Sequence, residues 1–144
     1  ADIVRYASGR FAPAEHDLYP TPEVAQLEQH LHDELGPHTR RFAYGALFQK
    51  PALLREIALH NVGRMQGWLF AALLPFAVGG LRKALGVTDE RVARSVDIVR
   101  REMDGISQRL SDGRRYLVAD RFTAADLAFA CLAAPVVFPP EYSA

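Results

Sequence analysis

Apolar residues recur at helical spacing along most of the chain, and this pattern predicts an all-α protein. Thr21 and Pro22 suit a helix start, and the apolar residues that follow lie three or four positions apart on one stripe, namely Val24, Leu27, Leu31 and Leu35. Gly36 and Pro37 should kink or interrupt this helix. We expect it to resume through Phe42, Leu47 and Phe48.

A second helix is predicted from Pro51, with a buried side formed by Leu54, Ile57, Ala58, Val62 and Met65. Pro75 should bend or break it, because a proline inside a helix removes one backbone hydrogen bond. Residues 67–81 carry no charge, but this run is shorter than the about 20 residues that span a bilayer. We therefore predict a helix buried on most sides within the domain, with Trp68 shielded and no membrane partner.

Two more helix starts are well marked. Thr88 precedes two acidic residues and a third apolar stripe, formed by Val92, Val96, Val99, Met103, Ile106 and Leu110, and Gly113 should follow its end. Thr123 and Asp126 have the spacing of a reciprocal capping box, and Phe122 and Leu127 are placed to form a hydrophobic staple around it. This fourth helix should run through Ala134 and end at Pro135 or at Pro139 and Pro140. The predicted fold is an all-α helical bundle.

Composition fits one soluble domain. The chain has 144 residues, 49% hydrophobic, and its 17 basic and 17 acidic side chains cancel. This balance gives no global field that would favour nucleic acid or an anionic membrane. The single cysteine, Cys131, excludes an internal disulfide and suits a reducing, cytoplasmic setting.

The segment around the capping box resembles a known family. Gly113, Tyr116-Leu117-Val118 and residues 120–127 are similar to the signature that enters the core helix of the C-terminal domain of cytosolic glutathione transferases. Residues 1–20, with Ile3, Val4 and Tyr6, resemble the end of that family's thioredoxin-like domain and its linker. Residues 21–144 then correspond to the all-α C-terminal domain.

The resemblance also implies that parts of the family's pattern lie elsewhere. The acidic-serine pair that holds the γ-glutamyl end of glutathione would precede Ala1, and the catalytic Ser, Tyr or Cys would lie further upstream. Ala1 is not an initiator methionine, and relatives continue beyond the position of Tyr142. We expect a piece of a longer protein, truncated at its C-terminus and without a catalytic residue of its own.

Candidate chemistry within the chain is sparse. His30 and His32 lie two apart on a helix and point to different faces, while His16, His38 and His60 have no neighbours of metal-site spacing, so no metal is expected. Cys131 lies among Ala128, Phe129, Leu132 and Ala133, which predicts an inert core thiol.

One cluster is a candidate for ligand binding. Arg40 and Tyr44 lie four apart on one helix face, and Arg41 is adjacent. Together they would offer a cation and a phenol to an anionic or aromatic ligand, in the helix that lines the electrophile pocket and faces the dimer partner in the resembled family. The alternative is a surface arginine that packs its stem along a tyrosine ring.

The resemblance implies a function for the parent protein. It would be a dimeric, cytoplasmic detoxification enzyme that conjugates glutathione to an electrophilic small molecule, with this domain as the wall of the electrophile pocket. An alternative is a non-catalytic assembly module, as in translation factors and aminoacyl-tRNA synthetases, where the same helical domain binds protein partners. A third is an unrelated helical bundle whose capping box matches by chance.

Overall fold

The computed structural model describes all residues except 1, 12, 14–15, 61–63, 119 and 139–144, and within helices the side chains of 2, 57–60, 64–66 and 68–72. The described part is all-helical and contains no strand. Its elements are α1 (Asp2–Phe11), α2 (Pro22–His30), the π-helical turn η2 (Leu31–Leu35), α3 (Gly36–Phe48), α4 (Pro51–His60), α5 (Arg64–Ala84), α6 (Asp89–Arg109) and α7 (Ala124–Val137). The all-α prediction is confirmed.

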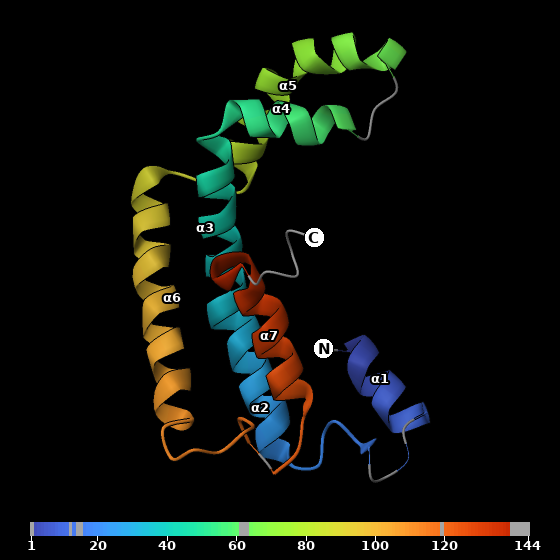
Figure 1. The fold of residues 1–144 in the computed structure, drawn as a ribbon, viewed down its shortest axis with the longest axis vertical. Coiled ribbons are helices and arrows are strands. Elements are labelled where there is room, and N and C mark those ends of the chain that lie inside the picture. The colour runs from blue at the N-terminus through green and yellow to red at the C-terminus, as the bar shows by residue number, and fades with distance from the viewer. Residues whose placement is uncertain (1, 12, 14–15, 61–63, 119, 139–144) are drawn as a thin grey trace.

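A column made of α2, η2 and α3 forms the centre of the bundle, and α6 and α7 pack along it (Figure 1). The predicted first stripe is buried: Val24 and Leu35 are 0% exposed and Leu31 is 1% exposed. Leu31 and Leu35 meet the buried positions of the α6 stripe, Val99 and Ile106, because both stripes face the same interior. Val24 packs instead against Ala124 and Ala125 at the start of α7.

The predicted kink or interruption at Gly36 and Pro37 takes the form of the π-turn η2, which ends directly before Gly36. The Gly36 amide donates to the Leu31 carbonyl there, and α3 follows without a loop. The wide turn lets the column continue past a proline that has no amide hydrogen to donate. A Cβ at Gly36 would lie 3.2 Å from a Leu132 methyl group, so α7 passes close to the column here.

The start of α6 is as predicted. Thr88 is its N-cap and its hydroxyl accepts a hydrogen bond from the Arg91 amide at 3.3 Å. The helix ends at Arg109, and Gly113 follows with a φ of 85°, a backbone conformation that glycine adopts without strain.

The Asp126 carboxylate ties the start of α7 to the preceding loop. It accepts 2.8 Å hydrogen bonds from the amide and the hydroxyl of Thr123, and a third at 2.8 Å from the amide of Leu117. Both halves of the capping box are present, although the short bond of the Thr123 hydroxyl is one that it donates. Phe122 is 47% exposed and contacts Tyr116 edge-on, so its staple contact with Leu127 stays a prediction.

The end of α7 agrees with the second of the two predicted limits, because the helix stops directly before Pro139 and Pro140. The helix passes through Pro135 to Val137, and Phe138 closes it with a left-handed φ of 47°. Pro135 is exposed, so water can bond the carbonyl that a proline leaves without its helical donor.

The N-terminal segment is attached to the bundle by polar contacts. Ser8 of α1 donates to Asp17 at 3.0 Å and accepts from the Leu18 amide at 2.9 Å. The Leu18 carbonyl in turn accepts from the Ala124 amide at 3.0 Å, at the first turn of α7. The pKa of Asp17 is lowered, mainly because its carboxylate accepts from the Tyr19 amide and from Ser8.

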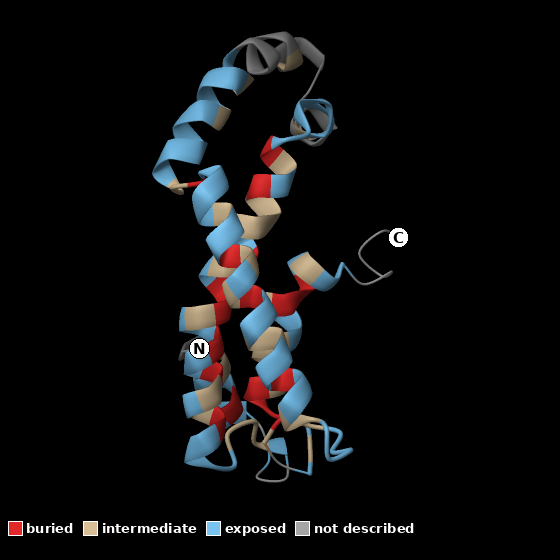
Figure 2. Cartoon of the chain, turned by 90° about the vertical axis from the view of Figure 1, so that its left-hand side faces the viewer, coloured by how far each residue is buried: buried red, intermediate tan, exposed pale blue. Residues whose placement is uncertain are grey.

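The prediction that the apolar run is buried within the domain is wrong for the described part of α5. Leu73 is 54% exposed, Phe76 80% and Leu81 43%, and Figure 2 shows the end of the molecule formed by α4 and α5 as mostly exposed. The run was expected to be covered by neighbouring helices, but α4 and α5 form a hairpin that packs mainly on itself and on the end of α3. The predicted burial of Ile57, Ala58, Val62, Met65 and Trp68 lies outside the described side chains.

Of the two outcomes predicted for Pro75, the break does not occur, because Pro75 lies inside α5, and the bend stays a prediction. Pro75 is exposed, so water can satisfy the carbonyl that it leaves without a donor. Among the described residues, no helix is both long enough and apolar enough to cross a lipid bilayer.

Candidate functional site

A cavity of about 290 Å³ lies between α3 and α7 and contains two of the three predicted ligand-binding residues. Arg40 and Tyr44 reach it from one side, and Cys131 and Leu132 reach it from the other. The rest of its lining is small or apolar: Gly36, Thr39, Ala43 and Pro135. Tyr44 stacks on Phe48 with 5.8 Å between ring centroids, which holds the phenol at the cavity edge. The arrangement is an apolar slot with one cation and one phenol.

Arg41, the third predicted ligand-binding residue, does not line this cavity and contacts α6 instead. Its guanidinium donates to the hydroxyl of Ser95 on α6 at 3.1 Å, and Ser95 is fully buried. A small cavity of about 120 Å³ beside Leu85 and Val87 is lined by Arg40, Arg41 and Tyr44 together. The structure therefore brings the three residues near one another, but Arg41 also serves as a link between α3 and α6.

His38 completes this link between helices. Its Nδ1 lies 3.0 Å from the Ser95 hydroxyl, which itself donates to the Arg91 carbonyl at 2.8 Å. Burial lowers the pKa of His38, and the nearby Arg41 charge lowers it further. The Arg41 Nη1 also lies 3.5 Å from this Nδ1, so His38, Arg41 and Ser95 form one polar contact between α3 and α6. Sequence reasoning missed Ser95, although its position three after Val92 and four before Val99 places it on the buried face of α6.

The prediction that Cys131 is an inert core thiol is wrong, because Cys131 is exposed. Helix α7 buries its small residues instead, Ala124, Ala125, Ala133 and Ala134, which let it approach the column closely. The apolar neighbours of Cys131 in sequence suggested a helix covered on all sides, whereas α7 is covered on one side only. The thiol is therefore accessible on the wall of the cavity.

A second cavity of about 190 Å³ adjoins the first and shares Cys131 and Leu132 with it. It extends to Val4 of α1 and to Glu28 and His32 of the column, with an apolar floor from α7 formed by Ala124, Leu127 and Ala128. Together the residues that line the two cavities extend along α7 from Val4 of α1 to Tyr44 of α3. Glu28 is itself buried and accepts from the Tyr19 hydroxyl at 3.0 Å, and burial together with this contact raises the pKa of Tyr19 to about 12.

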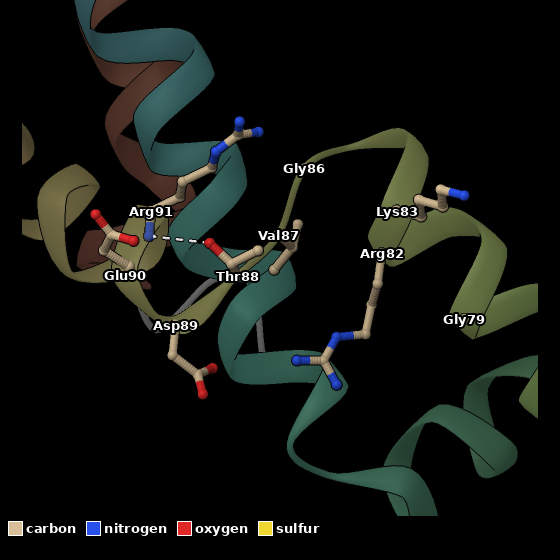
Figure 3. A pocket seen from close by; sticks show the side chains of 9 residues that line it. All are labelled: Gly79, Arg82, Lys83, Gly86, Val87, Thr88, Asp89, Glu90 and Arg91. Atoms are coloured by element: carbon tan, nitrogen blue, oxygen red, sulfur yellow. Dashed lines mark hydrogen bonds between the residues drawn. The ribbon is translucent and has the colours of Figure 1, made fainter.

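A larger hollow of about 730 Å³ lies where α5 leads into α6, but its polar side chains do not converge. Figure 3 shows Arg82, Lys83 and Arg91 pointing away from one another, while Asp89 and Glu90 add opposite charge. This open surface is a poor binding site for a small ligand, since the groups that fix a ligand must point at one place.

The described residues contain no group of three or more His, Cys, Asp or Glu side chains placed to hold a metal ion. His30 contacts Glu102 of α6 at 2.9 Å, which links two helices at the surface. His32 lines the second cavity instead, so the two histidines face different neighbours.

Comparison with known proteins gives one family. Residues 89–143 match the family model described as glutathione S-transferase, C-terminal domain. The matched part contains α6, the capping-box loop and α7. No curated protein and no solved structure matches the chain significantly.

Proposed function

We propose that the chain forms the electrophile-binding wall of a glutathione transferase, on the premise that residues 89–143 match the glutathione S-transferase C-terminal domain family. The parent protein conjugates glutathione to an electrophilic small molecule, works as a cytoplasmic dimer and serves detoxification. Glutathione is its co-substrate, held mainly by a thioredoxin-like domain that precedes residue 21. That domain lowers the pKa of the glutathione thiol and so generates the attacking thiolate.

The α3/α7 cavity is the observation that supports this proposal. Small-molecule sites are concave, mostly apolar and contain a few polar groups that fix orientation. The cavity has this composition: Leu132 and Pro135 are apolar walls, Tyr44 is a phenol and Arg40 is a cation. An aromatic electrophile would lie against the apolar wall, and Arg40 would attract the negative charge that develops as the thiolate adds to it.

Glutathione itself fits the two cavities poorly. It carries two carboxylates and an ammonium group, whereas the residues that line the first cavity include one charged side chain, Arg40. Glu28 of the second cavity is already bonded to Tyr19. The cavities therefore suit the second substrate, and they extend to α1, the helix that corresponds to the end of the glutathione-binding domain.

Cys131 supplies a site-specific test, since the only thiol of the chain lies on the cavity wall. We expect 1-naphthalenesulfonate, an unreactive aromatic anion, to slow the alkylation of Cys131 by iodoacetamide in a saturable way. Arg40→Ala should weaken this protection, because it removes the cation that faces the sulfonate. The rate of alkylation, followed by mass spectrometry, is the measurement.

Arg115→Ala is the matched control, since Arg115 lies over the ring of Tyr116, away from the cavity. It should leave the protection unchanged. Alkylation at the same rate with and without the aromatic anion would contradict the proposed pocket.

A non-catalytic assembly module is the second candidate, and the exposed apolar residues of the hairpin favour it. The two functions differ in one property of the intact protein. A transferase conjugates glutathione to an aromatic electrophile above the uncatalysed rate, and a module of this kind does not.

A further inference from the structure

The exposed half of α5 combines apolar and basic side chains without an acidic one. Phe76 is 80% exposed, Leu73 54% and Leu81 43%, and Arg82 and Lys83 follow directly in the last turn, also exposed. The sequence of α5 from 64 to 84 contains no Asp or Glu. Large apolar side chains exposed on one helix make that helix a candidate contact surface.

Charge is distributed unevenly between the hairpin and the rest of the chain. Residues 50–84 hold five of the 17 basic residues and one of the 17 acidic residues, so this segment has a net charge of four positive. The rest of the neutral chain has a net charge of four negative. The net charge of zero for the whole chain is thus the sum of a basic α4/α5 hairpin and an acidic remainder.

The hairpin also projects from the bundle. Figure 1 shows α4 and α5 beyond the ends of α3 and α6, at the opposite end of the molecule from the capping-box loop. A flat surface could therefore contact α5 while the acidic bundle stays in water. Figure 3 shows the side chains of Arg82 and Lys83 leaving the last turn of α5 in different directions, so the two charges lie on different sides of the helix.

We propose that α5 docks on the surface of a lipid bilayer that contains anionic lipids. Phe76, Leu73 and Leu81 enter the boundary between headgroups and acyl chains, while Arg82 and Lys83 contact lipid phosphates and carboxylates. Long basic side chains suit this position, because their stems can stay in an apolar layer while their charges reach the headgroups. The acidic bundle is repelled by the same surface, which orients the hairpin toward it.

A second copy of the chain is a poorer occupant of this surface. A two-fold symmetric contact through α5 would bring two basic hairpins together, since such an interface uses the same surface of both subunits. Contact between one hairpin and the acidic bundle of another copy would be head-to-tail. Head-to-tail contacts that do not close into a ring produce open-ended assemblies. An anionic bilayer provides both an apolar layer and negative charge.

Vesicle binding tests the proposal, with the full 144-residue chain and Trp68 as its single tryptophan reporter. We expect the chain to float with vesicles of equal parts phosphatidylcholine and phosphatidylserine, with a blue shift of Trp68 emission, and not with phosphatidylcholine alone. Raising the salt from about 0.1 M to 1 M shortens the screening length from about 10 to 3 Å and should weaken binding. Reversing both charges, in Arg82→Glu with Lys83→Glu, should weaken binding by more than about 30-fold, the loss that removing two positive charges alone would give.

Two further variants separate the contribution of the apolar side chains from the effect of net charge elsewhere in the chain. Leu73→Ser with Phe76→Ser should abolish the blue shift while leaving the helical circular dichroism of the bundle intact. Arg94→Glu with Arg100→Glu changes net charge equally at exposed positions of α6 and should bind as the unmodified chain does. The proposal is overturned if the chain ignores phosphatidylserine vesicles, if the α5 charge reversal binds normally, or if the apolar surface instead forms a dimer that Phe76→Ser disrupts.

Discussion

The bundle and the α4/α5 hairpin are both rich in apolar residues, yet only the bundle buries them. In the bundle, α2, η2, α6 and α7 surround the same interior, and Leu35 and Val24 are 0% exposed. In the hairpin, Phe76 is 80% exposed although its sequence neighbours carry no charge. An apolar pattern therefore predicts a helix in both regions, but it predicts burial only where another element of the chain lies against that helix.

The largest expected contrast is in stability. Leu35→Ala removes a fully buried side chain and should lower the free energy of unfolding by about 2–5 kcal/mol. Phe76→Ala removes a larger but exposed one and should change it by less than about 0.5 kcal/mol. Urea denaturation of both variants is the measurement. Equal losses would show that the hairpin belongs to the same core as the bundle.

Loss of the Asp126 carboxylate should have the second-largest effect on the free energy of unfolding. Asp126→Ala removes the acceptor for the amides of Leu117 and Thr123 and should destabilise the bundle by about 2 kcal/mol. Asp112 is a suitable control, since it bonds only to Arg114 within its own surface turn. The denaturation midpoint should fall for Asp126→Ala and stay in place for Asp112→Ala, and a midpoint unmoved in both would remove the structural role of the box.

The smallest effect concerns pH and the contact between α3 and α6. Because burial and Arg41 lower the pKa of His38 in the folded state, the unfolded chain binds the proton more readily. Stability from this residue is thus fully present above the unfolded pKa of about 6.5 and is lost as pH falls toward the lower folded pKa. Denaturation midpoints between pH 7.5 and 5.5 should fall more for the native chain than for His38→Gln. An identical pH dependence in both would show that His38 does not couple folding to protonation.

Sequence reasoning was most accurate where a local rule determines the structure. Caps at Thr88 and Thr123, and the stripes led by Val24 and Val92, depend on spacing along one helix. It failed where the outcome depends on what lies nearby in three dimensions. The exposure of Cys131 depends on which side of α7 meets the column, and that of Phe76 on the absence of a covering helix.

The predicted ligand-binding residues Arg40, Arg41 and Tyr44 show the same limit. Their spacing placed Arg40 and Tyr44 on one face, and they do line one cavity. The contact of Arg41 with Ser95 was not predictable, because it joins residues 54 positions apart. Proline positions alone did not determine the helix limits, since α5 passes through Pro75 and α7 passes through Pro135 but stops directly before Pro139.

The central claim is that these helices hold the second substrate and leave glutathione to another domain. Titration of glutathione into the 144-residue chain by calorimetry tests it most directly. The account predicts no measurable heat of binding, because the cavity residues offer one cation to a ligand with two carboxylates. Binding in the micromolar range, about −8 kcal/mol, would contradict it, since that affinity requires a complete glutathione site within this chain.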